Sequence, residues 1–139
     1  MIVIDAENSI MGRVAVFAVE KAKENESVAI VNCEKAIISG SRDYIIEKYR
    51  HMMSMGTPAH GPFLKRSPEW IMKRTIRGMV EHKKAKGETL LDRIKCYSGV
   101  PEDLKGAKME RAPGADASKL STRKYMSVNE LLSILGGSR

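Results

Sequence analysis

Aromatic residues, cysteines and long apolar runs are all scarce in this chain of 139 residues. Aromatics make up 5% of it, and its two cysteines, Cys33 and Cys96, form no CxxC pair and have no Cys/His ligand spacing. Cysteines of this kind are usually buried free thiols, with a disulfide or a metal site as the lesser alternative. No apolar run approaches the roughly 20 residues that a membrane-spanning helix requires, so we expect no membrane partner.

Signals for export are missing as well. The first residues, MIVIDAENSIMGR, carry an acid at position 5 and lack the basic-then-apolar order of a signal peptide. The length and an apolar content of 42% fit one soluble domain, residues 1–139, that buries about two-thirds of its unfolded surface. We therefore expect a cytoplasmic location.

The motifs of catalysis and cofactor binding are also absent. There is no GxGxxG or GxxxxGK[ST] loop, and His51, His60 and His82 have neither metal spacing nor an adjacent nucleophile. We expect no enzyme activity, no cofactor, no metal and no small-molecule substrate.

One enzymatic alternative stays open, a small nucleotide-binding α/β enzyme whose anionic ligand lies near Gly12-Arg13. For Gly12 we favour close packing as the explanation. For Arg13 we favour phosphate binding, because a positive charge early in a helix is disfavoured by the helix dipole.

Positive charge is what the chain does have, and it is concentrated in one block. The net charge is +7, and residues 60–97 alone hold ten Lys/Arg against four Asp/Glu, or +6. An RNA or DNA backbone is the commonest partner for such a block, and a solvated helix face that keeps the protein soluble is the alternative.

The apolar pattern predicts an α/β fold. Residues 1–5 and 27–32 form apolar runs typical of buried strands, and 10–25 between them form a helix capped by Asn8 or Ser9, which implies a βαβ unit with parallel pairing. Next we expect an extended stretch at 36–38, a helix at 42–55 and a loop at 56–66. These are followed by a helix starting at Ser67-Pro68-Glu69, a break at Lys86-Gly87, a helix at 88–92 and a strand at 94–97. The chain is expected to end with an irregular surface segment at 98–126 and a helix at 127–136 behind a capping box.

The helix after Ser67 has two chemically different faces. Lys73, Arg74 and Arg77 lie on one of them, with Trp70 on the same basic side. The residues expected to face inward are Met72, Thr75, Ile76 and Met79.

The basic block forms a track of cations on rigid and flexible elements, which favours recognition of RNA shape and backbone over base reading by one helix. No helix-turn-helix, zinc finger, basic zipper or RRM motif is present. Phe63 and Trp70 could stack on bases, although we favour a core or loop-anchor role for Phe63. The predicted RNA contacts are Arg13, Lys65, Arg66, Trp70, Lys73, Arg74, Arg77, His82, Lys83, Lys84, Lys86, Arg93 and Lys95.

Several short runs in this block carry a family resemblance. Gly61-Pro62-Phe63, Arg74-Thr75, Arg77-Gly78-Met79, His82-Lys83 and Leu91–Lys95 occur in order, after Gly12-Arg13, Val31-Asn32 and Ile38–Gly40 in the first half. Over about residues 1–103 the chain resembles the universal large-subunit ribosomal protein thirteen family in its archaeal/eukaryotic form. It departs from that family at Glu81, where a proline is usual.

The resemblance implies a three-layer α/β fold with a central, mainly parallel four-stranded sheet flanked by helices. It further implies an early-assembling structural constituent of the large ribosomal subunit, with large-subunit rRNA and neighbouring ribosomal proteins as partners and no catalytic role. A free RNA-binding translational regulator is the alternative. The polar, Gly/Pro-bearing composition of residues 98–126 is compatible with ordering on binding.

Overall fold

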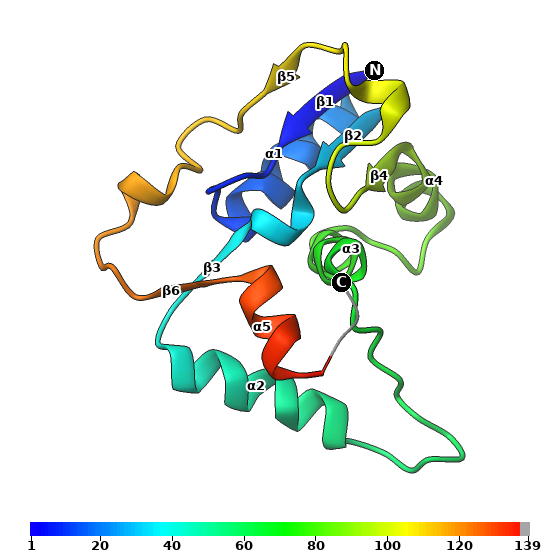
Figure 1. Ribbon diagram of the computed structural model, residues 1–139. Helices are drawn as coiled ribbons and strands as arrows, with labels where there is room; N and C mark the ends of the chain where they lie inside the picture. The colour runs from blue at the N-terminus through cyan, green and yellow to red at the C-terminus, as the bar shows by residue number, and fades with distance from the viewer. Residues whose placement is uncertain (137–139) are drawn as a thin grey trace.

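The centre of the molecule is a four-stranded sheet (Figure 1). The structure is a computed structural model and describes residues 1–136. All strand pairs in the sheet are parallel, and α1 (Met11–Lys23) connects the first two strands as the predicted βαβ unit. The α/β class and the parallel sheet are thus confirmed. The strand order is β4 (Ile94–Cys96), β2 (Val28–Val31), β1 (Ile2–Asp5) and β5 (Met109–Glu110).

The extended stretch after β2 leaves this sheet. Asn32 has a left-handed backbone with φ 57°, which asparagine tolerates better than most residues, and its side chain donates to Oδ1 of Asp5 at 2.9 Å. The 3₁₀ turn η1 (Cys33–Lys35) follows and redirects the chain. The next strand, β3 (Ile37–Ser39), consequently pairs antiparallel with β6 (Tyr125–Ser127) in a separate two-stranded sheet.

The two faces of the four-stranded sheet are covered differently. On one face Ile4, Val28, Ile30 and Ile94 join the main core, which includes buried residues of α1, α3 (Pro68–Gly78) and α4 (Ala85–Arg93). Ala15, Ala18 and Ala22 are fully buried and let α1 lie close to the strands. The other face, which includes Met109 of β5, is covered by three side chains from residues 97–104 instead of by a long helix. These are Tyr97, Val100 and Leu104.

The segment after β4, expected to be irregular, carries short elements of its own. It includes the 3₁₀ turns η2 (Glu102–Leu104) and η3 (Ala117–Lys119) and the strand β5. In Figure 1 it runs from β4 past the N-terminus to β5 and then along the edge of the molecule to β6. Its backbone is fastened to the start of α1, because Ala115 O accepts from Ile10 N at 2.6 Å.

The C-terminal helix α5 (Val128–Ile134) begins as predicted. The Ser127 hydroxyl accepts from the Glu130 N–H at 3.2 Å, but the Glu130 carboxylate pairs with Arg42 of α2 (Arg42–Ser54) instead of returning to the cap. That ion pair joins α5 to α2. The predicted cap of α1 is wrong: the N-cap residue is Ile10, with no side-chain hydrogen bond, since Asn8 and Ser9 lie outside the helix in the preceding turn.

Candidate nucleic-acid interface

Helix α3 carries the first part of the basic track and starts at the predicted place. Pro68 occupies the first helical position, where its missing N–H has no helical partner to lose. The hydroxyl of the N-cap residue Ser67 does not cap the helix, however. Within residues 1–136 it is buried without a hydrogen-bond partner, as is Oε2 of Glu69. Pro68 at the first helical position therefore marks the start of this helix, and the Ser67 side chain does not cap it.

The apolar face of α3 differs from the prediction at its end. Met72 and Ile76 are buried as predicted, and Ile71 is buried with them. Met79, which was expected to face inward, is 42% exposed because the helix ends at Gly78 and the chain turns there. Thr75 is half-buried.

The basic side of α3 is open to solvent. Arg74 and Arg77 are exposed, and among residues 1–136 no hydrogen bond or ion pair holds either guanidinium. Trp70 is 47% exposed on the same side, and the Lys65 amino group lies 3.9 Å from the centroid of its ring, a cation–π contact.

Phe63 contradicts the core or loop-anchor role favoured for it. Its side chain is 73% exposed, while the next residue, Leu64, is the one that packs against the core. Because Leu64 already attaches this part of the loop to the core, the Phe63 ring is left in solvent. Phe63, Lys65 and Trp70 thus form an exposed aromatic and cationic group beside Arg74.

Lys73 is turned toward the protein, unlike its two basic neighbours on α3. Its ammonium donates to the carbonyl oxygens of Leu91 and Ile94, where α4 passes into β4. Burial lowers the pKa of Lys73. A cation is favourable at the C-terminal end of a helix, where carbonyls lack intrahelical partners. This lysine accordingly stabilises the junction of α4 and β4.

The elbow, residues 79–84, joins α3 to α4 and presents His82 and Lys83 in exposed positions. Lys84 pairs with Glu81 at 3.1 Å, but both side chains are more than 70% exposed, so the pair contributes little stability. The elbow therefore keeps most of its positive charge available to a ligand.

The predicted helix at 88–92 is present, but the predicted break at Lys86-Gly87 is wrong. Helix α4 begins at Ala85 and runs through Gly87 to Arg93. A Cβ atom at Gly87 would lie 2.0 Å from the carbonyl oxygen of Glu81. The glycine is thus needed because the elbow crosses the helix here, and it does not end the helix.

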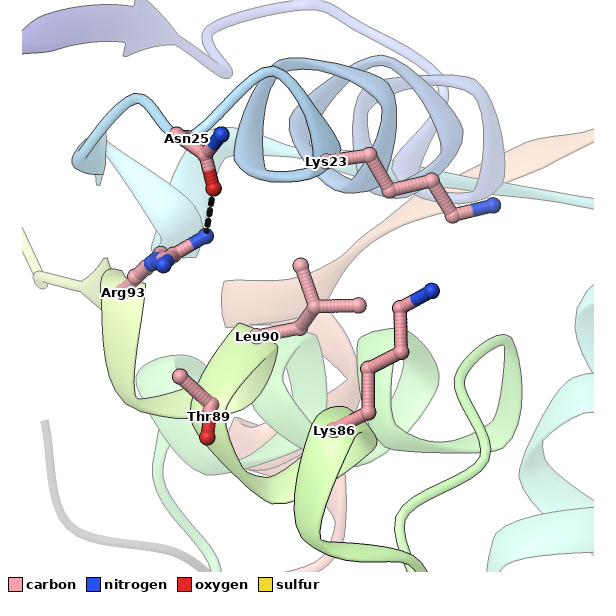
Figure 2. Close-up of a pocket in the computed structure, with 6 residues that line it drawn as sticks. All are labelled: Lys23, Asn25, Lys86, Thr89, Leu90 and Arg93. Carbon is pink, nitrogen blue, oxygen red and sulfur yellow. Dashed lines mark hydrogen bonds between the residues drawn. The ribbon is translucent and has the colours of Figure 1, made fainter.

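A cationic groove lies between the end of α1 and α4 (Figure 2). Its cavity has a volume of about 380 Å³. Arg93 donates to Oδ1 of Asn25 at 2.8 Å and to the Ala22 carbonyl at 3.3 Å, so this predicted RNA contact has protein acceptors. Lys23 and Lys86 project from the two walls of the groove, α1 and α4, and their amino groups lie at the end away from Arg93 (Figure 2). Sequence reasoning missed Lys23, because a lysine in the last turn of a helix is already explained by the helix dipole.

The Gly12-Arg13 corner does not have the expected chemistry. A Cβ atom at Gly12 would meet nothing within 4 Å, so the packing explanation for this glycine is wrong. The Arg13 guanidinium donates to the carbonyl oxygen of Gly114 and thereby fastens the segment after β5 to α1. Arg13 has a role in the fold that the sequence did not indicate.

The predicted contacts thus separate into two groups. Arg13, Lys73, Lys84 and Arg93 have hydrogen-bond or ion-pair partners within the protein, and Lys65 lies over Trp70. The others are exposed and, within residues 1–136, have no such partner. They are Arg66, Arg74, Arg77, His82, Lys83, Lys86 and Lys95.

The two cysteines are free thiols, as predicted, and neighbours in space. Cys33 is fully buried and Cys96 half-buried, and Cys33 N donates to Tyr97 O at 3.2 Å. The Cys33 thiol donates to the Ile30 carbonyl oxygen at 3.6 Å. The neighbouring Cys33 thiol lowers the pKa of Cys96, with help from the charge of Lys73. The proximity of Cys96, together with burial, raises the pKa of Cys33.

The fold and its basic face can now be compared with known proteins. Residues 1–103 match the sequence profile of the family described as Ribosomal protein L13. The chain belongs to this family. It is 40% identical over 136 residues to the large ribosomal subunit protein uL13 of Methanococcoides burtonii, with 98% of each chain covered. Identity to the protein of the same name from Haloarcula marismortui is 37% over 138 residues, covering 99% of this chain and 92% of the relative.

Family membership confirms the resemblance seen in the sequence. None of the helices formed by residues 1–136 is long and apolar enough to cross a membrane. The same residues include no group of three or more His, Cys, Asp or Glu side chains placed to hold a metal ion.

Proposed function

We propose that the chain is a structural constituent of the large ribosomal subunit that binds large-subunit rRNA and supports early subunit assembly. The family assignment and the names of the relatives support a place in that subunit. The observation that carries the RNA contact is the pair Arg74 and Arg77, two exposed cations on a rigid helix with no partner among residues 1–136. Free, ordered guanidinium groups are suited to bidentate phosphate contacts.

The elbow extends this contact along the surface. Lys83, Lys84 and Lys86 surround the N-terminal end of α4, where the helix dipole disfavours cations. Their presence there is explained by an anion that both the lysines and the unpaired helix N–H groups attract. A phosphate of the rRNA backbone is that anion in our proposal, and further phosphates contact Arg66, Lys95 and the lysines of the groove in Figure 2.

The role of these contacts is to hold converging RNA segments in place by neutralising their phosphates. The partners are large-subunit rRNA and neighbouring ribosomal proteins, and no catalytic step is involved. The competing nucleotide-enzyme hypothesis receives no support at Gly12-Arg13, since the Arg13 guanidinium is already bonded to Gly114.

A charge-reversal experiment tests the RNA contact. We expect Arg74→Glu combined with Arg77→Glu to weaken binding to an rRNA fragment strongly while leaving the circular dichroism spectrum unchanged. A matched control is Lys108→Glu combined with Lys119→Glu, which reverses the same charge at exposed positions on either side of β5. Equal weakening by both double variants, or by neither, would refute the assignment of the contact to α3.

A further inference from the structure

A cavity of about 260 Å³ lies between the loop before α3 and the basic side of that helix. Its lining combines two aromatic rings, Phe63 and Trp70, with several cations. The cations placed to contact a molecule bound in the cavity are Lys65, Arg74 and Arg77. This combination of flat apolar surface and positive charge restricts the chemistry of what the cavity binds.

The two aromatic rings of this cavity are exposed to solvent instead of being buried in the core. Phe63 is 73% and Trp70 47% exposed, although large apolar side chains stabilise a fold when they are buried. Two exposed rings beside arginines that have no partner among residues 1–136 therefore suggest a ligand that covers them. Rings in a positively charged groove are the platform on which single-stranded nucleic acids stack their bases.

Charge distinguishes a nucleotide from the other ligands that aromatic pockets bind. Among residues 1–136, no carboxylate lines this cavity, and Glu69 lines the neighbouring one instead. A cationic ligand, such as a methylated ammonium in an aromatic cage, would be repelled by Arg74 and Arg77. The ligand must be planar, partly apolar and anionic.

The position of Lys65 leaves a way for a base to enter. Its amino group lies over the Trp70 ring at 3.9 Å, and the indole also borders the neighbouring cavity beside Lys95 and Tyr97. A base can replace the ammonium, which is then free to meet a phosphate.

We propose that this cavity receives one unpaired nucleotide of the rRNA, with its base stacked on Trp70 and Phe63 and its phosphate held by Arg74 and Arg77. The proposal rests on the rRNA-binding function proposed above and adds to it a defined position on the RNA. Phosphate contacts position the protein but carry no sequence information, whereas a captured unpaired base marks one defined place on the RNA.

Trp70 makes the proposal directly testable, because it is the only tryptophan in the chain. The fluorescence of the full chain would be titrated with a short single-stranded oligoribonucleotide and with an abasic oligonucleotide of the same length and charge. We expect the first to quench Trp70 and the second to bind more weakly without quenching. Equal quenching by both, or quenching by neither, would overturn base stacking.

A substitution provides the second measurement. Base–aromatic stacking contributes about 1–3 kcal/mol, so Trp70→Leu should weaken oligonucleotide binding by about 5- to 150-fold. Tyr44→Leu is the matched control, since Tyr44 is 64% exposed on α2, away from the cavity. Unchanged affinity of Trp70→Leu would refute the inference.

The two proposals fail in different ways. If rRNA binding is lost in the Arg74/Arg77 double variant but unaffected by Trp70→Leu, the rRNA-binding function stands and the nucleotide pocket does not. If Trp70 is quenched by a neighbouring ribosomal protein and by no RNA, the pocket binds a protein side chain and the inference is overturned.

Discussion

At the scale of single residues, adjacent cations on α3 have different tasks. Lys73 donates to the carbonyls of Leu91 and Ile94, while the Arg74 guanidinium has no partner among residues 1–136. No sequence pattern separates the two, because both are basic residues on one side of a predicted helix. The difference arises from where α4 ends, which is a property of the tertiary structure.

Replacing each residue by methionine distinguishes the structural role of Lys73 from the RNA contact proposed for Arg74. Lys73→Met keeps most of the aliphatic stem but removes both hydrogen bonds, so it should lower the free energy of unfolding by about 1–3 kcal/mol. Arg74→Met should change that free energy by no more than about 0.5 kcal/mol and instead weaken rRNA binding. Urea unfolding and a filter-binding assay measure the two effects. An unaltered stability of Lys73→Met would contradict the structural role of Lys73.

The thiol pair makes a pH-dependent prediction. The neighbouring Cys33 thiol and the charge of Lys73 favour the thiolate of Cys96 and lower its pKa. Because the thiolate is the reactive form, the pH–rate profile for alkylation of Cys96 should have its midpoint at lower pH than in the urea-unfolded chain. Cys33→Ala should raise that midpoint. A folded-state midpoint at or above the unfolded one would show that burial dominates instead.

At the scale of elements, the junction between α3 and α4 depends on one glycine. Gly87→Ala places a methyl group 2.0 Å from the Glu81 carbonyl oxygen, and overpacking of this kind costs about 1–3 kcal/mol or more. Gly12→Ala is the control, since its methyl group meets nothing within 4 Å and alanine in a helix gains about 0.5–1 kcal/mol over glycine. Thermal unfolding should show opposite shifts. Two shifts in the same direction would argue against the close approach at Gly87.

The elements that follow from local chemistry were predictable from the sequence. The βαβ unit, the start of α3 at Pro68 and the Ser127 cap of α5 depend on short runs of apolar, proline or capping residues. The pairing of β1 with β5 was not predictable, because β5 has only two residues and leaves little apolar pattern. The break predicted at Gly87 was wrong for a similar reason. This glycine is required by the Glu81 carbonyl oxygen, and in the sequence it looks the same as a glycine that ends a helix.

The candidate site was predictable to a similar extent. Charge density identified the basic block, and helical spacing placed Arg74 and Arg77 together with Trp70. The exposure of Phe63 and the inward turn of Lys73 depend on tertiary packing, because Leu64 provides the anchor and α4 provides the acceptors. Lys23 joins the groove only because α1 and α4 pack side by side (Figure 2).

At the scale of the whole molecule, the charge distribution predicts strongly salt-dependent RNA binding. Six to eight phosphate contacts correspond to a slope of roughly −4 to −7 in log affinity against log salt concentration. The Arg74→Glu, Arg77→Glu variant should reduce that slope by about 1–2, since two contacts are lost. Titrations at several salt concentrations measure it. A slope near zero for the unaltered chain would contradict a phosphate-based interface.

The most direct test of the central claim is sedimentation of the chain in a lysate of the cells that produce it. After a wash at moderately high salt, sucrose-gradient fractions would be probed for the protein. We predict that it migrates with the large ribosomal subunit and with the precursors of that subunit. A protein that remains at the top of the gradient would contradict a ribosomal constituent and would instead favour a free RNA-binding regulator.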